Sequence, residues 1–276
     1  MTSQNHFHYK TAIMKYTSTL LLCSLSFFTA SSQSWKFSTH YSFGSPQQEM
    51  GSNIQAAHSF QIGVLYQLPG QLDNLSVGLE TGLGLYAHKR VDQTFKFDAN
   101  TSSVVPVNYN SNVFNINLQT RYNLLDEDRF DVVPYINAKA GLYNFYSNVV
   151  IEDPEDPNGC QALDRRNIIN DKTFYWGAGA GLQINPVIFS KTKRPSRVRL
   201  DIAANMIRGG TIDYINTKNL MDATSMPEPG AKPVYVQFIN VSTQQIHEHS
   251  VAQLYSSTLR LLEFRAGIAV MLGDKY

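Results

Sequence analysis

Hydrophobic and polar residues alternate along much of this chain, most fully in the stretch from Ser59 to Ala87. Apolar residues occupy every second position from Phe60 to Leu68, and the alternation resumes from Leu75 to Ala87 after a polar turn at residues 69–74. A period of two indicates β-strands with one apolar face each. Arms of about a dozen residues exceed the usual ~5–6 and reach the ~9–11 that a tilted strand needs to cross a bilayer. This stretch therefore predicts a long β-hairpin.

Six further segments show the same alternation, which brings the number of predicted strands to eight. They are residues 35–43, 113–124, 132–150, 173–184, 198–206 and 262–272. The connections alternate between short and long. Residues 69–74, 126–129 and 185–196 are short turns, whereas residues 44–55, 88–112, the stretch that begins at Glu152 and residues 209–256 are predicted as longer loops. This order favours an all-β fold, an eight-stranded antiparallel up-and-down transmembrane β-barrel with short periplasmic turns and long extracellular loops.

The polar face of these segments combines glycines with long charged side chains. Glycine weakens a strand that faces water, but inside a narrow barrel small residues leave room for long ones. Buried charges are tolerated when they pair with one another. We therefore expect an ionic network of three acids and four bases in the lumen, formed by Glu80, Arg121, Lys139, Arg199, Asp201, Glu263 and Arg265.

The opposite face is almost free of charged residues in all eight segments, as expected of a surface in contact with lipid. Aromatic residues gather near the ends of the segments, which is typical of the girdles at membrane interfaces. The predicted interface aromatics are Trp35, Tyr66, Tyr146, Phe174 and Trp176.

Composition and leader agree with an exported membrane barrel. Charged residues make up 16% of the chain, the net charge is +1, and no apolar run approaches the length of a transmembrane helix. A net charge so close to zero does not indicate a basic surface that could bind nucleic acid. Lys15, the apolar run from Leu20 to Phe28 and the small residues after it predict a cleaved signal peptide over residues 1–33, for which Met14 makes a tidier start than Met1. Residues 34–276 are then a single barrel domain.

At this point the chain resembles the small bacterial outer-membrane barrels of the OmpA-domain and OmpX kind and the outer-membrane β-barrel domain proteins of Bacteroidetes. The resemblance covers residues 35–276 and rests on the alternation, the unequal connections and the closing strand. It implies a location in the outer membrane and a filled lumen without a large pore. It contains no family-specific motif and so implies no functional residues.

One pair of residues raises the alternative of a lipid-modifying acyl hydrolase or transferase. His40 and Ser42 lie two residues apart on the polar face of the first strand, as a base and a nucleophile could. The sequence places no acidic residue to orient His40, so chance spacing is the favoured interpretation. A soluble lipocalin-like barrel with an apolar lumen is the other alternative.

Metal and thiol chemistry have little support. His247 and His249 flank Glu248 in a predicted loop without a third ligand, and the acidic stretch from Glu152 to Asn158 lacks the spacing of a calcium loop. Cys23 lies in the leader, which leaves Cys160 alone. The basic turn with Lys191, Lys193 and Arg194 is expected to be solvated.

The sequence thus predicts an integral outer-membrane β-barrel without enzymatic activity, cofactor or metal. Its expected role is structural, adhesive or partner-docking, through the outer loops. The expected contacts are outer-membrane lipid or lipopolysaccharide and a protein partner at those loops.

Overall fold

The computed structural model describes residues 35–96, 102–152, 162–189, 197–218, 220, 231–239 and 246–272. The predicted signal peptide, Cys160 and the basic residues Lys191, Lys193 and Arg194 lie outside this part. The strands are β1 (Trp35–Pro46), β2 (Ala57–Gln67), β3 (Leu75–Lys96), β4 (Ser102–Asn123), β5 (Val132–Glu152), β6 (Ala162–Ile184), β7 (Val198–Ile215), β8 (Lys232–Ile239) and β9 (Ile246–Leu272). The short helices are α2 (Gln48–Asn53), η1 (Gly70–Leu72) and η2 (Pro186–Phe189).

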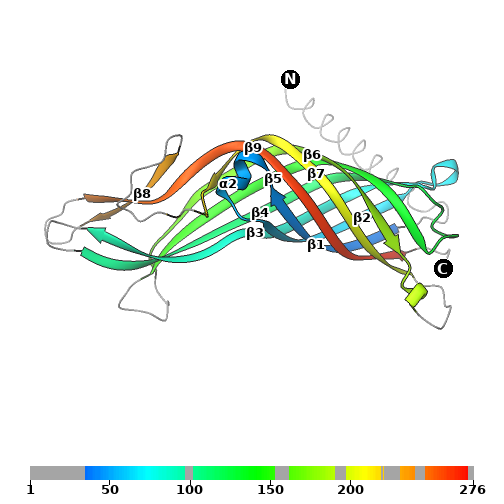
Figure 1. Cartoon of the computed structure of the whole chain (residues 1–276), viewed down its shortest axis with the longest axis horizontal. Helices are drawn as coiled ribbons and strands as arrows, with labels where there is room; N and C mark the ends of the chain where they lie inside the picture. The colour runs from blue at the N-terminus through cyan, green and yellow to red at the C-terminus, as the bar shows by residue number, and fades with distance from the viewer. Residues whose placement is uncertain are drawn as a thin grey trace, which may run out of the picture.

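The strands close into a barrel (Figure 1). Each strand from β1 to β6 pairs with the next one along the chain, and β9 pairs with both β7 and β1. The β1–β9 pairing runs from Trp35 opposite Leu272 to Pro46 opposite Leu261. β8 pairs with β9 and lies outside this closed wall. The predicted eight-stranded antiparallel up-and-down barrel is therefore confirmed, with β1 to β7 and β9 as its wall.

The apolar face of the wall points outward. Leu79, Leu118 and Ile202 are 61%, 54% and 43% exposed, whereas Arg121 and Glu263 on the polar face are 1% and 3% exposed. A soluble barrel with an apolar lumen would require the opposite arrangement. The strands are long because this alternation continues without interruption through the wall.

Glycines on the inner face allow neighbouring strands to approach closely. A Cβ atom at Gly141 would lie 2.0 Å from the carbonyl oxygen of Ile116, and one at Gly267 would lie 1.9 Å from that of Thr39. Both clashes are with backbone, which cannot rotate away as a side chain can. Any other residue at these two positions would push the strands apart.

Two stretches predicted as long loops are largely β-structure, so those predictions were wrong. β3 and β4 continue as a paired hairpin to Lys96 and Ser102, and the stretch 209–256 contains the end of β7, all of β8 and the start of β9. A register shift between Leu85 and Ala87 moves the side chains of β3 by one position, which conceals the alternation. On β4 the two faces exchange character beyond the barrel. The outward residues there are Asn108, Asn110 and Asn112, while apolar residues such as Val107 and Tyr109 point inward, so the stretch does not continue the pattern of the wall.

The third difference is in the first long connection, where residues 48–53 form helix α2. Met50 is fully buried and joins Ile54, Tyr86 and Leu261 in an apolar cluster inside the barrel. This cluster fills the interior on the side of the long connections.

Beyond the barrel the strands form an extension with its own core, visible on the left of Figure 1. The β6–β7 pairing ends at Tyr175 opposite Gly209, whereas β3 to β6 stay paired as one sheet and β7, β9 and β8 as another. The two sheets enclose an apolar cluster, made of Phe95, Val105, Val107, Tyr109, Val149, Ile151, Ile169, Ile215, Val251 and Ala252. The described helices include none long and apolar enough to span a membrane.

Tyr109 joins the two sheets of the extension through its hydroxyl group. The Gln93 side-chain amide donates to this oxygen at 2.6 Å, and the hydroxyl donates to the backbone carbonyl of Val251. Burial raises the pKa of the Tyr109 phenol, so it stays a neutral donor.

Replacing Tyr109 with phenylalanine is expected to weaken the extension by about 1–2 kcal/mol, because two buried hydrogen bonds are lost. The Gln93 amide and the Val251 carbonyl then keep only their direct hydrogen bond at 3.3 Å. Hydrogen exchange of the amides around Val251 should become faster, while the amides in the barrel wall should exchange as before. Tyr235→Phe is the control, because Tyr235 is 49% exposed on β8. Equal effects of the two variants would contradict this role.

Candidate functional site

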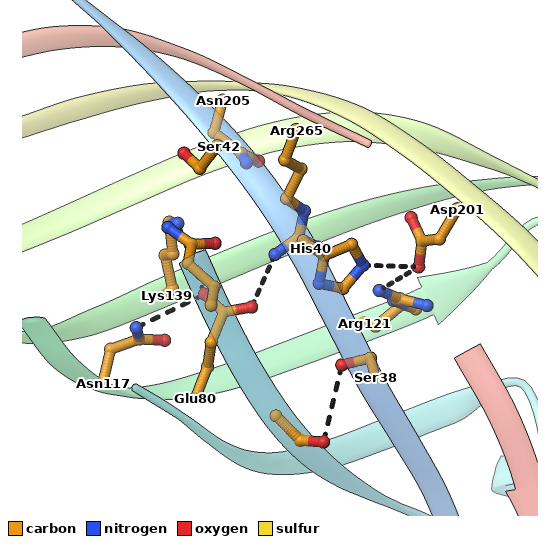
Figure 2. A network of polar contacts seen from close by, with 12 residues as sticks. Ser38, His40, Ser42, Glu80, Asn117, Arg121, Lys139, Asp201, Asn205 and Arg265 are labelled. Atoms are coloured by element: carbon orange, nitrogen blue, oxygen red, sulfur yellow. Dashed lines mark hydrogen bonds and ion pairs between the residues drawn. The ribbon is translucent and has the colours of Figure 1, made fainter. Parts of the chain in front are cut away.

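All seven charged residues predicted for the lumen are buried inside the barrel, each at most 3% exposed. They come from β3, β4, β5, β7 and β9 and converge because inward positions alternate with outward ones on every strand. Figure 2 shows five of them together with the polar residues around them.

The central group joins two acids and two bases. Lys139 Nζ lies 2.6 Å from Glu263 Oε2 and 3.6 Å from Glu80 Oε1, and Arg265 Nη1 lies 2.7 Å from Glu80 Oε2. The Glu263 carboxylate also accepts hydrogen bonds from Gln61 and Asn205 at 2.8 Å each and from Ser42 at 3.1 Å. These extra donors offset the loss of solvent around the buried charges.

A second group surrounds Asp201. Arg121 Nη2 lies 2.8 Å from Asp201 Oδ2, and the Tyr135 hydroxyl donates to Asp201 Oδ1 at 2.5 Å. The guanidinium of Arg121 also lies over the Tyr135 ring, 4.1 Å from its centroid. His40 Nε2 is 3.5 Å from Asp201 Oδ2.

A third group lies at the end of the short turns and was only partly predicted. Lys36 Nζ lies 2.6 Å from Glu127 Oε2, and Arg199 donates to the backbone carbonyls of Glu127 and Phe130. In the part of the chain that the structure describes, Arg199 forms no ion pair. Contrary to the expectation, it therefore does not take part in the central ionic group. Lys36 could have been found from its position on the polar face of the first strand. Glu127 gave no such signal, because it lies in a turn that folds into the barrel end.

The arrangement around His40 does not form an aligned nucleophile and base. The structure supplies the acid that the sequence could not place, Asp201. However, Ser42 donates to Glu263 and Ser38 to the Gly63 carbonyl at 3.5 Å, and neither His40 ring nitrogen has a hydrogen-bond partner among the described residues. His40 is also 1% exposed, so a substrate has no access to it.

The predicted interface aromatics lie near the two ends of the barrel wall. Trp35 and Tyr66 pack together at the short-turn end, with ring centroids 5.0 Å apart. Phe174 and Trp176 are 61% and 50% exposed on the outer face of β6, and Tyr146 is half-buried on β5. Their contact with a membrane interface remains a prediction.

The remaining candidate sites show no metal chemistry in the described residues. They contain no group of three or more histidine, cysteine, aspartate or glutamate residues that could hold an ion. His247 and His249 belong to β9 and not to a loop, which corrects the prediction, and their side chains lie outside the description. Within the acidic stretch only Glu152 is described, and it forms an ion pair with Arg90 at 2.7 Å.

Comparisons with known proteins concern the overall shape alone. No protein-family model matches the chain, and no curated protein matches it. The structure is similar to neisserial surface protein A, with 13% identity over 87% of this chain and 97% of that one at a TM-score of 0.43. It is also similar to a major outer membrane protein from Thermus thermophilus, with 12% identity over 87% and 99% of the two chains at a TM-score of 0.42. A third similar structure is the attachment invasion locus protein of Yersinia pestis, with 10% identity over 88% and 100% at a TM-score of 0.33. Because these identities and TM-scores are low, the assignment of the fold rests on the strand pairing described above.

Proposed function

We propose that this protein is an integral β-barrel of the bacterial outer membrane, exported through a cleaved signal peptide, and that it acts without catalysis as a structural and partner-docking protein. The observation that supports this proposal most directly is the outer face of the barrel. No outward position carries Asp, Glu, Lys or Arg in one uninterrupted stretch of each wall strand: residues 35–45, 58–66, 75–85, 112–122, 136–146, 174–184, 198–206 and 262–272. We call this belt the apolar band. Its length fits the ~9–11 residues of a membrane-crossing strand.

The two ends of the barrel differ in the way that the proposed orientation requires. Compact turns with η1 and η2 close one end, which we assign to the periplasm. The two-sheet extension continues from the other end, which we assign to the cell exterior. Short periplasmic turns and long outer connections are the rule for such barrels.

The filled interior supports a role other than transport. The ionic groups, the cluster around Met50 and the core of the extension follow one another along the barrel axis, and all of these side chains are buried. Catalysis is also disfavoured, because His40 is enclosed and both nearby serines are engaged elsewhere. The extension then remains as the surface for a protein partner, and the apolar band as the surface for outer-membrane lipid.

Single cysteines at positions of matched exposure test this orientation. Val104 in the extension and Leu72 in η1 are both 56% exposed, and Leu79 in the apolar band is 61% exposed. In a Cys160→Ser background, a membrane-impermeant maleimide should label Val104→Cys on intact cells. It should label Leu72→Cys only after the outer membrane is permeabilised, and Leu79→Cys only in denaturant.

Two results would contradict the proposal. One is equal labelling of Leu72→Cys and Val104→Cys on intact cells, and the other is rapid labelling of Leu79→Cys in the native protein. The purified protein in a planar bilayer should in addition show no stepwise conductance, because the lumen is filled.

A further inference from the structure

Two arginines face each other on the outer surface just beyond the apolar band. Arg208 on β7 and Arg260 on β9 are direct partners in the antiparallel register. Each lies two positions beyond the last outward apolar residue of the band on its strand, Met206 on β7 and Leu262 on β9, at the end of the band next to the extension. Like charges directly opposite each other on one sheet face are destabilising, so this pair is unfavourable unless an anion binds to it.

No carboxylate neutralises this pair within the described part of the chain. Arg208 is exposed and forms no ion pair there, and Arg260 donates to the side-chain oxygen of Gln48 in α2, which is uncharged. Asp171 and Asp213 lie further from the band and are engaged: Asp171 accepts from the Asp213 backbone N–H at 2.8 Å, and Asp213 from the Ser256 hydroxyl.

The neighbouring strand adds a third cation and an aromatic ring. On β6, Trp176 is the register partner of Arg208 and is 50% exposed. Lys172 lies four residues further toward the extension on the same strand, and its side chain is exposed. Arg208 thus lies between Arg260 on one side and an aromatic ring on the other, with another positive charge further toward the extension.

We propose that Arg208 and Arg260 bind the phosphate of an anionic lipid headgroup in the outer leaflet. Arginine presents a planar fork of donors that matches phosphate oxygens, and two such forks around one phosphate remove the repulsion between them. Lys172 increases the local positive charge, and Trp176 contacts the lipid below the headgroup. This inference rests on the proposed membrane function and names the lipid chemistry that one side of the barrel selects.

The position of the arginines favours a lipid over a soluble anion or a peptide. Met206, Leu262 and Trp176 continue directly from the charged residues into the apolar band. A molecule that carries a phosphate on acyl chains contacts both surfaces at once. Free phosphate would gain only the charged half of the site.

Fluorescence of Trp176 provides a local measurement. The chain contains two tryptophans, so Trp35→Phe leaves Trp176 as the single reporter. In that background the barrel is inserted into vesicles that contain brominated phosphatidic acid or brominated phosphatidylcholine, and bromine quenches a tryptophan in contact with the lipid. Quenching should show a preference for the phosphatidic acid, and Arg208→Gln together with Arg260→Gln should reduce that preference by about fivefold per arginine.

Arg129→Gln is the control, because Arg129 is an exposed arginine in a turn at the other end of the barrel. It should leave the preference unchanged, and inorganic phosphate at millimolar concentration should not abolish it. Equal quenching by the two lipids, or an unchanged preference in the double variant, would overturn the inference. The mobility shift on heating in detergent shows whether the double variant still inserts and folds. If it does, either of these two outcomes contradicts the lipid inference alone and not the membrane function. Failure of the Trp35→Phe barrel to insert would instead contradict the membrane function.

Discussion

Replacing Glu263 with leucine is expected to lower the free energy of unfolding of the barrel by about 3–5 kcal/mol, the usual cost of leaving one partner of a buried ion pair alone. Glu263 is the acceptor for Lys139 at 2.6 Å and for the side chains of Gln61, Asn205 and Ser42. Without the carboxylate, Lys139 retains only Glu80 at 3.6 Å, which already binds Arg265. Reversible unfolding by urea in lipid vesicles measures the change.

A double variant separates the buried charge from the lost volume. Lys139→Met combined with Glu263→Leu removes both members of the pair and leaves Glu80 with Arg265 and Asp201 with Arg121. This variant should recover much of the loss, because every charge that remains in the groups around Glu80 and Asp201 keeps its partner. The exposed pair of Asp126 and Arg129 is the control, and removing Asp126 should change stability by less than about 1 kcal/mol. A Glu263→Leu barrel as stable as the native one would mean that the network is hydrated.

Replacing Leu79 with arginine is expected to destabilise the inserted barrel by about 2–4 kcal/mol. Leu79 lies near the middle of the apolar band on β3 and is 61% exposed, so no packing inside the protein is disturbed. The cost arises because the guanidinium must enter hydrocarbon. The same unfolding measurement in vesicles applies.

Leu72→Arg is the matched control, since Leu72 is also an exposed leucine, at 56%, but lies in the η1 turn beyond the band. It should have an effect within about 0.5 kcal/mol, as surface substitutions usually do. Equal and small effects at both positions would show that the band faces water, and the membrane proposal would then fail.

Much of the barrel could be predicted because alternation is a local property of the chain. Whether Glu80 and Leu79 point to opposite sides follows from their adjacency in one strand, and the same holds for Arg121 and Thr120. Where the local signal was interrupted, the prediction failed. The bulge after Leu85 concealed the continuation of β3, and Asn108, Asn110 and Asn112 on the outer face of β4 made a strand resemble a loop.

The pairing of charges could not be predicted in the same way. Its inward position placed Arg199 among the other lumen charges, but Arg199 donates to backbone carbonyls of a turn. Lys36 forms an ion pair with Glu127 of the same turn, 91 residues away along the chain. The arginine pair on the outer face depends likewise on the register between β7 and β9. The sequence of one strand does not indicate which residue of another strand will lie opposite a given position.

By itself, therefore, the sequence determined the strands of the wall, the two faces of each strand, which of those faces is the inner one, and the order of short and long connections. Only the tertiary structure decided that the wall strands continue into a second core, and which acid meets which base. The physical reason is one of range. Side-chain direction along a strand repeats every two residues, whereas closure, register and ion pairing bring together residues that the chain separates by many tens of positions.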